Sequence, residues 1–267
     1  DALAGVDAVV HLAARVHMMR DPAHDPLAQY RAVNAAGTLN LARQAAAAGV
    51  RRFVYLSSVK VNGEGRAAPY RDADPADPRD PYAVSKWEAE QGLAAIARDS
   101  GLEVVVLRPP LVYGPGVKAN FRGLLRLVER GWPLPLACID NRRSLVYLGN
   151  LVDAIRVCLD HPEAAGRTFL IDDGEPVSTP RLVTAIAGAM GTSPCLLPVP
   201  PALLRLAGRL LGRRAAVERL TGSLAVDATA LRDALDWVPT YRFEQGIAAS
   251  VAAYRAADRL DAFGFTG

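Results

Sequence analysis

The sequence predicts an α/β fold, a doubly wound parallel sheet with helices on both faces, and two observations predict it. Apolar runs typical of buried strands lie at residues 6–14, 52–58 and 102–109. Segments with helical periodicity, 27–48 and 82–99, separate these runs. Strands that alternate with helices are typical of parallel sheets. At 267 residues and 51% hydrophobic, the chain can bury one large or two unequal domains.

Composition excludes several classes of protein. The formal net charge is only +3, which gives no field for binding nucleic acid. Three cysteines, odd in number and far apart, match no metal site or disulfide framework and fit a reducing compartment. No signal peptide and no apolar run of about 18 residues is evident, so we expect a cytoplasmic protein without membrane insertion.

The first two elements end in recognisable signals. The strand Val6–Ala14 closes with Leu12, Ala13 and Ala14, where small side chains suit a close approach of another molecule to the backbone. A tightly packed corner is the alternative. We expect His11 to be a packed core residue rather than a catalyst. The helix that follows ends at Gly49, a favoured stop.

The most informative stretch begins at Tyr82 and ends at Lys86. Residues four apart on a helix share one face, so the ammonium is expected to favour an ionised phenol and to lower the Tyr82 pKa from its free value of about 10. Tyr82 would then act as a general base. Ser58, at the end of the preceding strand, can hold the same substrate oxygen. The pattern predicts proton transfer to or from an alcohol or carbonyl, with a partner that takes a hydride.

An isolated Tyr-x-x-x-Lys pair is often only a solvated helix face, but here it lies within a longer order of strand, serine pair, loop, helix and strand. That order, together with Arg108-Pro-Pro-Leu-Val-Tyr-Gly-Pro-Gly116, resembles the extended short-chain dehydrogenase/reductases. Within them it is most similar to the NAD-dependent nucleotide-sugar epimerase/dehydratase family, of the UDP-glucose/UDP-GlcNAc 4-epimerase type. The resemblance runs from Val6 to about Trp237.

The resemblance implies a domain plan. Residues 1–115 would form part of a Rossmann-like dinucleotide-binding domain, and 116–267 mainly a smaller α/β substrate lobe, with some segments returning to the main sheet. The family's glycine-rich phosphate turn is absent. We therefore expect that roughly three strands and two helices of the family's domain precede residue 1.

The resemblance also implies a cofactor, NAD. NADP is not excluded, because the residue that reads the ribose 2′ group lies in the part expected before residue 1. The positions that match the family's cofactor contacts are Leu12, Ala13, Ala14, Asn34, Ser57, Tyr82, Lys86 and Pro109. For Asn34 the alternative is a buried amide whose hydrogen bonds are satisfied by the backbone.

A UDP-sugar substrate is implied at Ser58, Tyr82, Asn120 and Arg143. Asn120 matches an amide at the diphosphate, and it could equally cap a helix. A guanidinium suits a diphosphate because its donors are planar and always charged. Arg142 is the fallback for Arg143, and an ordinary surface arginine is the alternative. Lys60 could touch substrate or be solvated.

The C-terminal half is predicted to form a lobe of helices and short strands. Helices are expected at 117–130, 151–160 and 243–258, and short strands at 141–147 and 168–171. Another helix would begin with Thr179 as its cap and Pro180 in first position. The Leu- and Arg-rich stretch 198–222 fits helices of a substrate lobe, and a basic amphipathic segment lying on a membrane is the alternative.

The function implied by the resemblance is NAD-dependent epimerisation at C4 of a UDP-hexose or UDP-N-acetylhexosamine through a 4-keto intermediate. One alternative is NAD(P)H-dependent reduction of the 4-keto group of a UDP-6-deoxyhexosamine in surface-polysaccharide synthesis. Another is a non-catalytic dinucleotide sensor, which the retention of Ser58, Tyr82 and Lys86 disfavours. The resemblance further implies a homodimer through helices 27–48 and 82–99.

Overall fold

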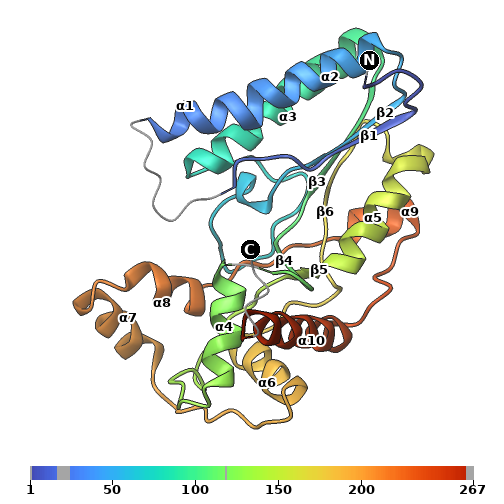
Figure 1. The fold of residues 1–267 in the computed structure, drawn as a ribbon. Coiled ribbons are helices and arrows are strands. Elements are labelled where there is room, and N and C mark those ends of the chain that lie inside the picture. Colours follow the sequence, from blue (N-terminus) through green and yellow to red (C-terminus); the bar gives the residue numbers. More distant parts are fainter. Residues whose placement is uncertain (1, 17–24, 118, 263–267) are drawn as a thin grey trace.

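The computed structural model describes residues 2–16, 25–117 and 119–262, and its centre is a parallel sheet. The strands are β1 (Ala8–His11), β2 (Arg52–Leu56), β3 (Glu103–Arg108) and β6 (Thr168–Leu170), in the order β1-β2-β3-β6. All three pairings are parallel, with His11 beside Tyr55 and Tyr55 beside Val106. The sheet (Figure 1) confirms the predicted α/β class.

One face of the sheet is covered by two long helices. The first is continuous through α1 (Pro26–Tyr30), a π-helical segment (Arg31–Gly37) and α2 (Thr38–Ala47), and the second is α3 (Pro81–Ser100). Phe53 and Tyr55 of β2 point into this layer. The two helices approach closely because Gly92 has no side chain, and a Cβ there would lie 2.5 Å from a methyl of Leu39.

The opposite face is covered by α5 (Leu148–Asp160) and α9 (Thr229–Leu235). Val54, between Phe53 and Tyr55 in β2, packs into this second core with Leu107 and Trp237. Successive side chains of a strand point to opposite faces, so a strand buried on both sides is apolar throughout. This explains why β2 and β3 could be recognised as uninterrupted apolar runs.

The remaining helices build a lobe around a separate pair of short parallel strands, β4 (Leu111–Tyr113) and β5 (Leu145–Tyr147). Its core joins Tyr113, Phe121, Ile186 and Ile247, among others. β6 follows these strands in the chain yet pairs with β3 in the main sheet. The boundary near residue 115 stays a prediction. The lobe's helices are α4 (Ala119–Glu129), α6 (Thr179–Ala189), α7 (Pro201–Leu210), α8 (Arg214–Thr221) and α10 (Phe243–Ala262).

Two details differ from the predicted elements. The cap of α6 is Ser178, whose extended backbone lets its hydroxyl accept from the Arg181 N–H at 3.3 Å, so Thr179 is the first helical residue and the expectation for Thr179 is wrong. Of residues 141–144 only Arg143 forms isolated bridges, to Val177 and Leu224, and the strand itself is limited to 145–147. Among the described residues, no helix combines the length and apolar composition needed to cross a bilayer.

Candidate active site

Three strand ends meet at one edge of the main sheet. β1, β2 and β3 are parallel neighbours, so the residues after them gather at the carboxyl edge, where ligands of such sheets bind. After β1, Leu12 and Ala13 are exposed and Ala14 is half-buried. Ala13 and Ala14 carry only a Cβ, so this loop can admit a ligand close to its backbone. After β3, Pro109 is buried, and its carbonyl accepts from the Val59 N–H at 3.0 Å.

The start of α3 places Tyr82 and Lys86 beside the end of β2. Asp80 caps the helix, accepting from the Ala83 N–H at 2.7 Å, and Pro81 occupies the first turn. The Lys86 Nζ donates to the Leu56 carbonyl at 2.8 Å and lies 6.0 Å from the centre of the Tyr82 ring. The Ser58 hydroxyl forms a hydrogen bond with that of Tyr82, so the structure brings together the side chains of Ser58, Tyr82 and Lys86.

The pKa of Tyr82 is raised to about 12, not lowered as the sequence led us to expect. Burial is the largest cause and the Asp80 carboxylate the next, while the Ser58 hydroxyl acts in the opposite direction. The expectation failed because the Lys86 ammonium is held on the Leu56 carbonyl and over the ring of Tyr55, 4.6 Å from its centre. The phenol as found carries its proton at neutral pH.

Lys86 is itself perturbed. It is 2% exposed, and burial lowers its pKa to about 8, against the opposing effect of the Glu90 carboxylate. An ammonium has three N–H donors, and the carbonyl of Leu56 uses one. Contact of the remaining donors with a cofactor ribose stays a prediction. Together with the small residues after β1, these donors agree with a dinucleotide at this edge.

A buried ion pair lies behind the serines. The Arg108 guanidinium donates to Glu90 through Nε at 3.0 Å and Nη2 at 2.5 Å, and both side chains are 5% exposed. The Ser57 hydroxyl donates to the same Glu90 carboxylate, and Arg108 also reaches Asn62 at 3.1 Å. The Ser57 proton is thus used internally, which leaves only its lone pairs for a cofactor.

Sequence reasoning assigned no role to Glu90 or to the Arg108 side chain. A signal for Glu90 was present, because it follows Lys86 by four residues and so lies on the same face of α3. Arg108 offered no comparable signal, since its contact with α3 depends on how the strand packs against the helix.

Asn34 lies in the π-helical segment and is fully buried. Its amide nitrogen donates to the Arg15 carbonyl and to the Ser85 hydroxyl, each at 3.0 Å, and its oxygen accepts from the Arg15 N–H at 2.8 Å. Both amide hydrogens are used, so the buried-amide interpretation is confirmed. Asn34 ties the loop after β1 to the helix of Tyr82, and its expected contact with the cofactor stays a prediction.

Lys60 is half-buried and forms two ion pairs. Its Nζ lies 2.5 Å from Asp80 Oδ2 and 3.3 Å from Glu64 Oε1. Its backbone N–H donates to the Ser58 hydroxyl at 3.2 Å. Lys60 thus links the loop of Ser58 to the cap of α3, and its contact with substrate stays a prediction.

The residues expected at the diphosphate lie in the lobe. Arg143 donates through Nη1 to the carbonyls of Arg219 at 2.7 Å and Gly222 at 3.2 Å, at the end of α8, and burial lowers its pKa. It is therefore more than an ordinary surface arginine, whereas Arg142 is exposed. Asn120 is the second residue of α4, and its side chain lies outside the described part of the chain. Contact of either residue with a diphosphate stays a prediction.

A parallel α/β sheet with serine, tyrosine and lysine at its carboxyl edge defines an enzyme of the short-chain dehydrogenase/reductase type. Residues 1–172 match the model of the NAD dependent epimerase/dehydratase family. The chain belongs to this family. The family and fold predicted from the sequence are thereby confirmed, and with the family the NAD cofactor.

Two comparisons bear on the activity, and a third bears on the fold. The chain is 48% identical to a Vibrio cholerae protein named UDP-glucose 4-epimerase, over 94% of this chain and 77% of that protein. It is 28% identical to the GDP-6-deoxy-D-mannose reductase of Pseudomonas aeruginosa, over 94% and 81%. The crystal structure of UDP-glucuronic acid 4-epimerase from Bacillus cereus with NAD superposes with a TM-score of 0.75 at 17% identity, over 95% and 76%, which shows the common fold.

Proposed function

We propose that this protein interconverts a UDP-hexose or UDP-N-acetylhexosamine with its C4 epimer through a 4-keto intermediate. The observation that carries the proposal is the meeting of Ser58, Tyr82 and Lys86 at the sheet edge. It is supported by the 48% identity to the Vibrio cholerae protein named UDP-glucose 4-epimerase.

Each side chain has a separate task in this reaction. Tyr82 takes the proton of the sugar 4-hydroxyl and later returns it. Ser58 donates a hydrogen bond to the same oxygen as it becomes a carbonyl. Lys86 holds the cofactor ribose. NAD, when bound, supplies a hydride acceptor and a positive charge. The residues that would hold NAD include Leu12, Ala13, Ala14, Lys86 and Pro109, and those for the UDP-sugar diphosphate are Asn120 and Arg143.

The test supplies the complete protein and NAD with UDP-glucose or UDP-N-acetylglucosamine. An epimerase forms the C4 isomer with no net change in nicotinamide absorbance, since the hydride leaves and returns to the same carbon. Net reduction of NAD, or no isomer with either sugar, would contradict the proposal.

A second candidate is 4-keto reduction of a UDP-6-deoxyhexosamine in surface-polysaccharide synthesis. Two observations favour it: the 28% identity to a Pseudomonas reductase, and the Tyr82 pKa of about 12, which keeps the phenol ready to donate a proton. A reductase turns over only when a 4-keto sugar and NADH or NADPH are supplied, and it oxidises one cofactor for each product.

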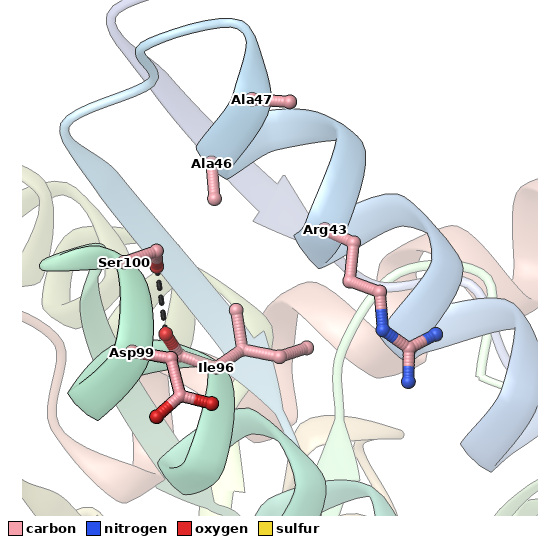
Figure 2. A pocket seen from close by; sticks show the side chains of 6 residues that line it. All are labelled: Arg43, Ala46, Ala47, Ile96, Asp99 and Ser100. Atoms are coloured by element: carbon pink, nitrogen blue, oxygen red, sulfur yellow. Dashed lines mark hydrogen bonds between the residues drawn. The ribbon is translucent and has the colours of Figure 1, made fainter.

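For the assembly we propose a homodimer formed through α2 and α3. Figure 2 shows their C-terminal turns side by side, with Arg43 and Ala46 on α2 opposite Ile96 and Asp99 on α3. They border an open hollow of about 420 Å³ at the outer surface of the helix layer. Ala46→Arg should weaken a dimer seen in analytical ultracentrifugation.

For location we propose the cytoplasm, since all three cysteines are free.

A further inference from the structure

Helix α7 carries an apolar face that the rest of the described chain does not cover. Leu203, Leu206 and Leu210 recur at helical spacing, and Leu211 follows at the end of the helix. These four side chains, the leucine face, are between 53% and 78% exposed. A single exposed leucine is ordinary, but four together on one short segment mark an interaction surface.

The other sides of α7 hold it to the lobe. Leu204 packs against the lobe core, and Gly208 lies so close to Val217 of α8 that a Cβ at 208 would come within 2.6 Å of it. The leucine face therefore points outward from a fixed helix pair. Figure 1 shows α7 and α8 at one end of the molecule, beyond α4, where they can meet a flat surface.

The same segment is strongly basic. Residues 201–222 contain five arginines and a single acidic residue, Glu218, which pairs with Arg214 at 2.6 Å. Within the described parts of the chain, no carboxylate forms an ion pair with Arg205, Arg209 or Arg213. All three of these arginines are exposed. Their charge is thus free to act on a partner.

We propose that α7 and α8 dock the protein on an anionic lipid surface, with the leucine face in the headgroup boundary and the arginines against lipid phosphates. Leucines beside unpaired arginines match an interfacial helix that lies on a bilayer without crossing it. A second copy of the chain fits poorly, because a symmetric contact would bring the same arginines against each other.

The test is flotation of the complete protein with vesicles. Vesicles of phosphatidylcholine and phosphatidylglycerol should carry the protein upward in the gradient. Vesicles of pure phosphatidylcholine should carry at least tenfold less protein. Raising the salt concentration should weaken binding, since exposed charges are screened. Replacing both Leu206 and Leu210 by Glu should lower binding at least tenfold, with unchanged circular dichroism and turnover.

A matched control separates the leucine face from a general effect of added charge. Val152 of α5 is 57% exposed and lies on another helix, so Val152→Glu should bind vesicles like the natural protein. Equal binding by the Leu206/Leu210 variant, or no preference for phosphatidylglycerol, would overturn the proposal. Loss of a dimer in that variant, seen by ultracentrifugation, would instead assign the leucine face to a second copy and would also overturn it.

Discussion

The Lys60 ammonium lies 2.5 Å from Oδ2 of Asp80, the residue that caps the helix of Tyr82. The other carboxylate oxygen of Asp80 accepts from Ala83, and the Lys60 backbone donates to Ser58. Lys60 thus connects the loop that carries Ser58 to the helix that carries Tyr82. It also neutralises a carboxylate that raises the Tyr82 pKa.

Removing the Lys60 charge should therefore shift the pH profile of turnover. In Lys60→Met the Asp80 charge is no longer balanced, so the pKa of Tyr82 rises further. In a plot of kcat against pH, the rise that reports ionisation of Tyr82 then moves to higher pH by about 0.5–1 unit. Lys60→Arg should restore the natural profile.

Asp80→Asn keeps a capping side chain and removes the charge, so it should move the same rise to lower pH. The two opposite shifts separate electrostatics from a loosened loop, which would lower kcat at every pH. Equal shifts in one direction from both variants would contradict the explanation.

Glu90→Gln should destabilise the fold strongly. The change keeps the side-chain shape but leaves the buried Arg108 guanidinium without a counter-charge, and breaking a buried pair in this way costs about 3–5 kcal/mol of unfolding free energy. Glu88→Gln, two residues away, removes the exposed pair with Arg31 and should cost less than about 1 kcal/mol. Urea denaturation of both variants measures the two losses of unfolding free energy. Similar losses would contradict the larger cost assigned to breaking the buried pair.

Stability should also depend on the titration of Lys86. Its pKa falls from 10.5 to about 8 on folding, so between these values the unfolded chain binds more protons than the folded one. Unfolding free energy therefore rises with pH across that window, by about 3 kcal/mol in total. Lys86→Met lacks this titration, and its unfolding free energy should rise less over the same range. Parallel pH curves for the two proteins would contradict the lowered pKa.

The strands and helices of the main sheet were predictable because each carries its own signal. β2 and β3 are apolar throughout, and α3 lies between a capping aspartate with its proline and Gly101, whose φ of 74° favours glycine. The neighbourhood of Tyr82 and Lys86 followed from helical spacing alone. Only local patterns are needed for these conclusions.

What the sequence could not give depends on contacts between elements. Spacing placed Lys86 near Tyr82 but could not show that the Leu56 carbonyl and the Tyr55 ring hold the ammonium, so the direction of the Tyr82 pKa shift was predicted wrongly. The ion pair of Glu90 with Arg108 likewise joins a helix to a strand end.

Replacing Tyr82 by phenylalanine is the most direct test of the site, because it removes one hydroxyl from a half-buried ring. With UDP-glucose or UDP-N-acetylglucosamine, whichever the natural protein converts, kcat should fall by about 10²–10⁴-fold while the affinity for UDP-sugar, measured by calorimetry, stays within a few-fold. A Tyr82→Phe protein that still forms the C4 isomer at a rate close to the natural one would contradict the assignment of proton transfer to this residue.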